Sequence, residues 1–290
     1  MPALLQDYEL QSLIAVGAMA EVWRGVDRRD ERPVAIKVLH SHLQRQNQVR
    51  ELFLAEQQLL STLPQHSGLV HGLACDDLAD RPFLVMSLAR GHDLRHWVAP
   101  VVGGAFGQGV AAVKQHALPL AVALDIVART ADAIAHLHQQ GWLHGDIGPS
   151  NIVVDNATHA ATLETTPATV VVCDLGIARR IGDGGPVRGT HAYMAPEQVR
   201  GETWTTATDV FALGVLLWEL VTGARLFHRG PGYLSGAAVI EASVPSVGIV
   251  RLDALLTKML AKSKHYRIST MDKVIVELAE LGPRSDTPGR

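Results

Sequence analysis

The chain has 290 residues, enough for one large domain or two lobes with a substantial core. Hydrophobic residues make up 47% and charged residues 19% of it, which excludes an extensively disordered protein. The formal net charge of −3 argues against a nucleic-acid partner, and two cysteines are too few for a disulfide framework, which favours a reducing, cytoplasmic location.

The first ninety residues are rich in predicted strands. Short runs of apolar and β-branched residues are separated by Gly, Asp-Arg and Arg-Pro pairs. A helix is expected over residues 48–63, where apolar residues recur at helical spacing. This part therefore predicts a small antiparallel sheet with one helix. The predicted strands cover residues 8–17, 20–27, 32–40 and 81–88.

From about residue 90 the pattern becomes mainly helical. A long helix is expected over 118–141, which opens with a proline and closes with a glycine. Two short strands follow at 151–154 and 169–174. The most apolar run, 210–221, carries Glu219 and is shorter than the ~20 residues that a membrane span needs, so it predicts a buried core helix. The N-terminus lacks the features of a signal peptide, and we expect no membrane anchor.

Three further segments have the composition of surface structure. Residues 101–113 are glycine-rich and predict a loop, and residues 155–169 predict a long polar connection between two strands. The tail 282–290 is expected to be disordered.

Lys37 and Glu56 are the first candidate site residues. Lys37 interrupts an apolar strand run, V-A-I-K, where taken alone it reads as an edge-strand lysine. Glu56 lies among the apolar positions of the next helix, where a carboxylate needs a partner. A strand lysine held by a helix glutamate is the ion pair that positions ATP phosphates in kinases.

The run A-V-G-A-M-A-E-V, residues 15–22, lies between the first two predicted strands. In protein kinases a glycine-rich loop at this place closes over the phosphates, because its backbone approaches them closely. Here only the middle glycine, Gly17, is present, and Ala15 replaces the first one. By itself the motif is equally consistent with a plain hairpin.

The run H-G-D-I-G-P-S-N, residues 144–151, fits a catalytic-loop pattern. Asp146 would act on the hydroxyl of the phosphoryl acceptor, and Asn151 would hold a metal ion. Asp174 follows a predicted strand and precedes Gly176, a place where its carboxylate would bind Mg²⁺. Downstream, residues 189–197 end in the triplet A-P-E, as the activation segment of a kinase does.

Together these motifs resemble bacterial members of the eukaryotic-like, Hanks-type serine/threonine protein kinases. The resemblance runs from about Tyr8 to Leu281, nearly the whole chain. It rests on Lys37, Glu56, Asp146, Asn151, Asp174, the A-P-E triplet and Asp209, which occur in order at the spacing of the family.

This resemblance implies a bilobal protein kinase fold of the α+β class over residues 8–281. The N-lobe would be 8–88 and the mainly helical C-lobe 89–281, with ATP and Mg²⁺ (or Mn²⁺) bound between them. Asp209 would lie buried beneath the catalytic loop, and Arg267 would pair with Glu197. Met86 would be the gatekeeper and residues 87–89 the hinge. The implied ATP-binding residues are Ile14, Gly17, Val22, Ala35, Lys37, Met86, Ser87, Leu88, Ala89 and Val153.

Two glycines of the catalytic loop depart from the family. Gly148 stands where these kinases have a lysine that neutralises the γ-phosphate, and loss of such a group costs about 2–4 kcal/mol by analogy with oxyanion donors. Gly145 replaces the arginine that reads a phosphate on the activation loop. The segment 177–189 contains no Ser, Thr or Tyr, so the phosphate-binding arginine and a residue that could carry the phosphate are both missing. Thr190 matches a structural threonine that contacts the catalytic aspartate.

These observations predict an ATP-dependent kinase that phosphorylates Ser or Thr on a protein substrate and is not controlled by activation-loop phosphorylation. Control would come from a regulatory protein, from expression, or not at all. The main alternative is a pseudokinase, a nucleotide-binding interaction module, which Gly148 and Ala15 favour. A small-molecule kinase is the other alternative, since the catalytic loops of such enzymes often begin H-G-D, but the A-P-E segment opposes it.

Overall fold

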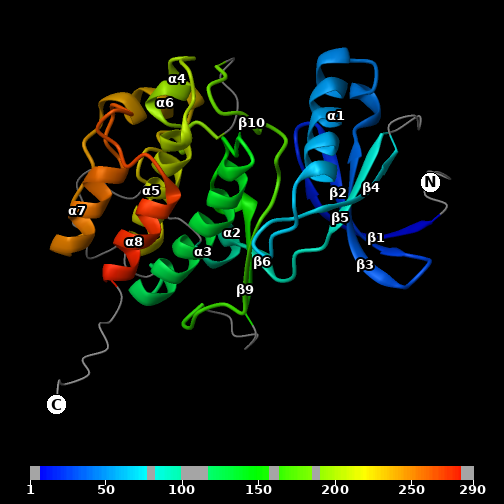
Figure 1. Ribbon diagram of the computed structural model, residues 1–290, viewed down its shortest axis with the longest axis horizontal. Coiled ribbons are helices and arrows are strands. Elements are labelled where there is room, and N and C mark those ends of the chain that lie inside the picture. Colours follow the sequence, from blue (N-terminus) through cyan, green and yellow to red (C-terminus); the bar gives the residue numbers. More distant parts are fainter. Residues whose placement is uncertain (1–6, 77–81, 99–116, 157–162, 185–189, 282–290) are drawn as a thin grey trace. The chain divides into compact units, whose positions relative to one another are not determined.

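The computed structural model describes residues 7–76, 82–98, 117–156, 163–184 and 190–281, which fall into two compact units (Figure 1). The first unit comprises the described residues up to Arg90 together with Cys173–Ile177, and the second comprises the others. The predicted loop 101–113, part of the connection 155–169 and the predicted tail 282–290 lie outside the described residues.

The first unit is built on a five-stranded antiparallel sheet with the order β1-β2-β3-β5-β4. One more strand is present than the sequence predicts, because β4 (G-L-A-C-D) contains no β-branched or aromatic residue. The strands are β1 (Tyr8–Val16), β2 (Ala20–Asp27), β3 (Arg32–Leu39), β4 (Gly72–Asp76) and β5 (Phe83–Ser87).

The alternation of side chains along β3 separates the core of this sheet from its candidate site residues. Val34, Ile36 and Val38 pack with Tyr8, Phe83 and Val85 in one buried cluster. Ala35 and Lys37 occupy the intervening positions and therefore face the other side of the sheet. β3 is thus the element that places Lys37 opposite the apolar core.

One α-helix, α1 (Asn47–Thr62), accompanies this sheet, as the sequence predicts, and lies alongside it in Figure 1. Phe53, Glu56 and Leu60 are buried on one of its faces. A hydrogen bond ties the helix to the sheet at a second point, since the side-chain amide Nε2 of Gln57 donates to the carbonyl of Phe83 over 2.7 Å. A short 3₁₀ helix, η1 (Ser41–Leu43), precedes α1.

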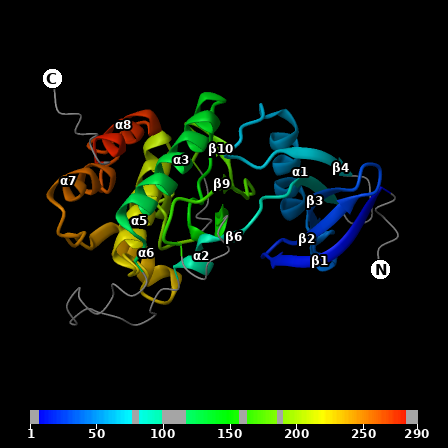
Figure 2. The same cartoon turned by 90° about the horizontal axis from the view of Figure 1, so that it is seen from below.

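The second unit is mainly helical, as predicted. Its central helix, α5, is buried along almost its whole length, and it contacts α3, α7 and α8. Figure 2 shows α3 and α5 running side by side. Within the described residues, none of the helices has the length and apolar character needed to cross a bilayer. The helices are α2 (Leu94–Trp97), α3 (Leu120–Gln139), α4 (Pro196–Val199), α5 (Thr206–Thr222), α6 (Gly232–Glu241), α7 (Val250–Met259) and α8 (Met271–Leu281).

Two small sheets complete the second unit. One has the order β6-β8-β9 and the other pairs β7 with β10, both antiparallel. The strand predicted over 169–174 ends earlier, so that Cys173 and Asp174 follow β9. The strands are β6 (His92–Asp93), β7 (Trp142–Leu143), β8 (Ile152–Asp155), β9 (Thr169–Val172) and β10 (Arg179–Arg180), and the 3₁₀ helix η4 (Pro149–Asn151) precedes β8.

Candidate active site

The first unit brings together Lys37, Glu56 and Asp174. The Nζ of Lys37 lies 2.8 and 2.7 Å from the two carboxylate oxygens of Glu56, and 2.8 Å from Oδ1 of Asp174. The side chains of Lys37 and Glu56 are only 8% and 1% exposed. Burial acts to lower the pKa of Lys37, but the negative charges of Glu56 and Asp174 outweigh it and raise that pKa, so the ammonium stays protonated. The predicted Lys37–Glu56 pair is therefore present.

Asp174 adopts an unusual backbone conformation. Its φ of 62° lies in the left-handed region, which residues other than glycine rarely occupy. The backbone N–H of Gly176 donates to Oδ1 of Asp174 over 3.2 Å, and Lys37 binds the same oxygen. The side chain of Asp174 is nevertheless 49% exposed. The backbone of Asp174 is thus strained, and its carboxylate is bound by Lys37 and Gly176 yet remains partly accessible.

The glycine-containing run forms the tight turn between β1 and β2. The N–H of Gly17 donates to the carbonyl of Ala20 over 2.9 Å, which closes the turn. Nε2 of His40, after β3, donates to the carbonyl of Gly17 over 2.8 Å. Ile14 is exposed and Val22 is half-buried. His40 thus tethers the turn to the next strand, a role that no local sequence pattern indicated.

The other predicted ATP-binding residues of this unit lie on β3 and β5 or directly after them. Ala35 and Met86 are both buried and are directly opposite each other in the β3–β5 register. The N–H of Ser87 donates to the carbonyl of His71 over 3.0 Å, so this N–H is already engaged within the unit. Of the three predicted hinge residues, only Leu88 and Ala89 are then left to offer a backbone N–H to a nucleotide. Both are half-buried.

In the second unit, the buried carboxylate of Asp209 binds the start of the predicted catalytic loop, residues 144–151. The N–H groups of His144 and Gly145 donate to the two oxygens of Asp209, over 2.9 and 2.8 Å, and Nε2 of His138 donates to Oδ2 over 2.8 Å. Burial acts to raise the pKa of Asp209, but His138 and the backbone donors bring it below its usual range. The predicted placement of Asp209 beneath this loop is confirmed, and His138 is an anchor that its position on a helix did not reveal.

Both carboxylate oxygens of Asp146 are held. The N–H of Thr190 donates to Oδ1 over 2.9 Å, and the amide Nδ2 of Asn151 donates to Oδ2 over 3.1 Å and to the Asp146 carbonyl over 2.8 Å. Thr190 makes this contact through its backbone. Because the amide nitrogen of Asn151 faces Asp146, the amide oxygen points elsewhere and is the atom suited to a cation. The loop therefore fixes the orientation of one carboxylate and one amide.

The two glycines of this loop occupy different environments. Gly145 has φ of +78°, and a Cβ at this residue would lie 2.6 Å from the Cζ3 atom of Trp204. Gly148 is extended, with φ −173° and ψ 170°, a conformation open to any residue. A Cβ there would meet the ring of Tyr193 at 3.6 Å, an ordinary van der Waals contact. A side chain at Gly145 would therefore be strained and would clash with Trp204, whereas Gly148 can accept one.

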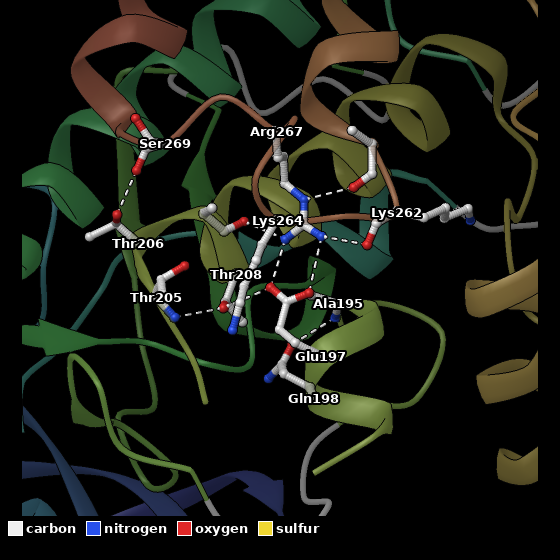
Figure 3. A network of polar contacts seen from close by, with 12 residues as sticks. Ala195, Glu197, Gln198, Thr205, Thr206, Thr208, Lys262, Lys264, Arg267 and Ser269 are labelled. Atoms are coloured by element: carbon white, nitrogen blue, oxygen red, sulfur yellow. Dashed lines mark hydrogen bonds and ion pairs between the residues drawn. The ribbon is translucent and has the colours of Figure 1, made fainter. Parts of the chain in front are cut away.

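The A-P-E triplet ends in a buried ion pair, shown in Figure 3. NH1 and NH2 of Arg267 lie 2.7 and 3.0 Å from the two oxygens of Glu197, and the hydroxyl of Thr208 donates to Glu197 over 2.9 Å. Burial acts to raise the pKa of Glu197, but Arg267 and Thr208 lower it by more, so the pKa falls below its usual range. The predicted pairing of Arg267 with Glu197 is confirmed.

The donors predicted to bind metal suit a hard cation. Asp174 in the first unit offers a partly exposed carboxylate, and Asn151 in the second offers an amide oxygen. Carboxylate and amide oxygens are the ligands that Mg²⁺ prefers, and Mn²⁺ accepts the same set. Val153, the last predicted ATP-binding residue, is half-buried in β8 of the second unit.

Comparison with known proteins agrees with these motifs. Residues 8–277 match the family model described as "Protein kinase domain". The chain is 32% identical to the serine/threonine-protein kinase PknB of Mycobacterium leprae over 96% of its own length and 43% of that protein. It is 31% identical to PknB of Mycobacterium tuberculosis, over 97% and 44% of the two chains. It is 33% identical to PknA of Mycobacterium tuberculosis, over 79% and 50%.

The chain thus spans half or less of the length of these curated relatives. The family match, in contrast, covers nearly all of the present chain, from the first strand of the sheet to the last helix. It includes every residue named in the contacts above. The chain belongs to the protein kinase domain family.

Proposed function

We propose that this chain is an active serine/threonine protein kinase that transfers the γ-phosphoryl group of ATP to a hydroxyl of a protein substrate. Its relatives PknB and PknA are named serine/threonine-protein kinases, and the chain matches them over most of its length. The residue types that phosphoryl transfer requires are present, and the contacts within each unit hold them in defined orientations.

The observation that carries the proposal is the double restraint on Asp146. Thr190 holds one of its oxygens and Asn151 the other, in a loop suspended from buried Asp209. A carboxylate fixed in this way is pre-oriented to accept a proton without reorganising during the reaction.

In the proposed step, the acceptor hydroxyl oxygen forms a bond to the γ-phosphorus while the bond to the β-phosphate oxygen breaks and ADP leaves. Bound ATP–Mg²⁺ supplies the phosphoryl group and charge neutralisation. Lys37, kept in place by Glu56, would orient the phosphates, and Asp174 and Asn151 would hold the metal. Asp146 would receive the proton of the hydroxyl.

The direct test is phosphate transfer from γ-labelled ATP with Mg²⁺ or Mn²⁺ to a generic acceptor such as casein. We expect label on serine or threonine of the acceptor with the wild-type protein, and its loss with Asp146→Asn. Binding of ATP without any transfer would instead support the pseudokinase alternative, a nucleotide-binding interaction module.

Gly148→Lys is expected to raise kcat. The extended backbone accepts a side chain, and the new Cβ would only touch Tyr193. A lysine here restores the cation that family members place beside the γ-phosphate; because such preorganised groups are worth roughly 10²–10³-fold, we expect a rise of about tenfold or more. Gly148→Met, which adds a stem without charge, is the control and should not raise kcat. An unchanged kcat in folded Gly148→Lys protein would contradict the idea that the wild type lacks a cation beside the γ-phosphate.

Activity is also expected to be independent of activation-loop phosphorylation. Gly145 supplies no cation to clamp a phosphate, and residues 177–189 contain no hydroxyl to carry one. Phosphatase-treated protein should therefore start at the same rate as protein preincubated with ATP. A lag that preincubation abolishes, with phosphate mapped to Thr190, would contradict the expectation, whereas phosphate elsewhere at constant activity would not.

A further inference from the structure

Trp204 is a large buried side chain next to the catalytic loop that none of the proposed catalytic roles uses. It is 0% exposed, and its six-membered ring lies where a side chain of residue 145 would be. The indole Nε1 is buried without a hydrogen-bond partner among the described residues. The ring therefore contributes through its shape and its aromatic face rather than through a hydrogen bond.

The backbone of Trp204 pairs with the segment that follows β10. Its carbonyl accepts from the N–H of Gly182 over 3.1 Å, and its N–H donates to the carbonyl of Asp183 over 3.0 Å. These two bonds join the residues that directly follow β10 to the backbone of Trp204. The first part of the activation segment, Arg179–Gly184, is thus bonded to β7 on one side and to Trp204 on the other.

The side chain of Trp204 makes a second link to the same segment. The guanidinium carbon of Arg179 lies 3.7 Å from the centre of a Trp204 ring, a close cation–π contact. The neighbouring Arg180 makes a similar contact with Trp142, at 4.2 Å, but not with Trp204. Of the two arginines of β10, therefore, Arg179 is the one joined through Trp204 to Gly145.

Gly145 passes this restraint to Asp146. Its N–H is held by Asp209 and its carbonyl accepts from the side chain of Gln198 over 2.9 Å. Gly145 has no side chain, and its φ of +78° is one that other residues rarely adopt. The Trp204 ring therefore packs directly on the backbone that precedes Asp146. Arg179, Trp204 and Gly145 form one continuous contact path from the activation segment to the catalytic loop.

We propose that Trp204 and Arg179 are positioning residues that order the activation segment against the catalytic loop without a phosphate. In place of an arginine that reaches out from the loop to a phosphate on the segment, an arginine of the segment reaches in to an aromatic ring packed on the loop. The arginine thus belongs to the segment instead of the loop, and the contact forms without phosphorylation. The inference rests on the proposed kinase activity for its kinetic readout alone.

The test compares Arg179→Met with Arg180→Met. The second variant removes the contact with Trp142 and a 3.3 Å hydrogen bond to the carbonyl of Gln140, but it leaves Trp204 untouched. Hydrogen exchange of the Ile181–Gly184 amides is followed by mass spectrometry, and kcat and KM for ATP are measured by γ-labelled phosphate transfer. For Arg179→Met we expect roughly tenfold faster exchange and a similar loss of kcat, the size of a partly desolvated cation–π contact. KM for ATP should not change. Arg180→Met should stay within about twofold of wild type in both readouts.

A double-mutant cycle with Trp204→Leu shows whether the effect passes through the ring. With the ring removed, Arg179→Met should have a clearly smaller effect on exchange and kcat than it has in the wild type. If Trp204→Leu does not fold, Trp204→Phe replaces it, and the effect of Arg179→Met should then be reduced. Equal effects of Arg179→Met and Arg180→Met, or additive effects of the two changes in the cycle, would overturn the inference. If the wild type transfers no phosphate, the proposed activity fails, and the exchange difference still decides the positioning role.

Discussion

Asp146→Asn is expected to lower kcat by roughly 10²–10⁴-fold, the usual contribution of a positioned acid–base group. Asparagine has the same shape as aspartate but cannot accept the proton of the acceptor hydroxyl. The amide oxygen can still accept from the N–H of Thr190, and Asn151 keeps its bond to the carbonyl of residue 146. Only the 3.1 Å bond from Asn151 to the second side-chain oxygen is lost, because an amide nitrogen donates and cannot accept. The loop should therefore keep its conformation while losing its base.

This prediction separates chemistry from binding. Mg²⁺–ATP should raise the melting temperature of Asp146→Asn as much as that of the wild type, because a ligand bound only to the folded state stabilises it and Lys37 and Glu56 are unchanged. Asp272→Asn, in the first turn of α8, changes the net charge equally and should retain full kcat. A variant that keeps its kcat, or that loses the ATP-dependent shift, would contradict the role given to Asp146.

Arg267→Met is expected to lower the free energy of unfolding by about 3–5 kcal/mol, because it leaves a buried carboxylate unpaired. Arg267 is 4% exposed and meets both oxygens of Glu197. Its guanidinium also donates to the carbonyls of Ala207 and Ala261, over 2.8 and 2.9 Å. Methionine fills most of the same volume, so the loss is one of polar partners rather than packing.

Urea unfolding of the two proteins measures this difference, and an exposed ion pair provides the control. Nζ of Lys258 lies 2.6 Å from Oε1 of Glu277, but the lysine side chain is 52% exposed. Glu277→Gln should therefore lower the free energy of unfolding by less than about 1 kcal/mol. A change in Arg267→Met as small as that in Glu277→Gln would show that water or a rearrangement satisfies Glu197 when its partner is gone.

The same pair gives a pH dependence with a defined sign. The folded-state pKa of Glu197 is lowered, so its contribution to stability is fully present above its unfolded value and is lost as pH falls through the folded value. Protonation of Glu197 also removes the charge that Arg267→Met leaves unpaired. The stability difference between wild type and Arg267→Met should therefore be largest near neutral pH and should shrink in acid.

The residues of the candidate site could be identified from the sequence because their chemistry demands fixed residue types in a fixed order. Lys37 and Glu56 lie within a predicted strand and helix, and Asp146 and Asp174 follow predicted elements, whose patterns are local. The same holds for most of the fold, since period-2 and helical patterns arise from burial on one face. β4 was missed because its short run carries neither pattern. The tethers His40 and His138 were missed because their partners, Gly17 and Asp209, are distant in sequence.

The two glycines of the catalytic loop show what only the tertiary structure decides. In the sequence, Gly145 and Gly148 are alike: each replaces a basic residue of the family pattern within one short loop. The structure separates them, because Gly145 has a left-handed backbone and abuts Trp204, whereas Gly148 is extended beside the face of Tyr193. The order of residues determined which charges are missing. Whether a side chain fits at either glycine depends on its backbone φ and on the nearby ring of Trp204 or Tyr193. Both rings come from segments distant in sequence, so the loop residues alone do not determine the outcome.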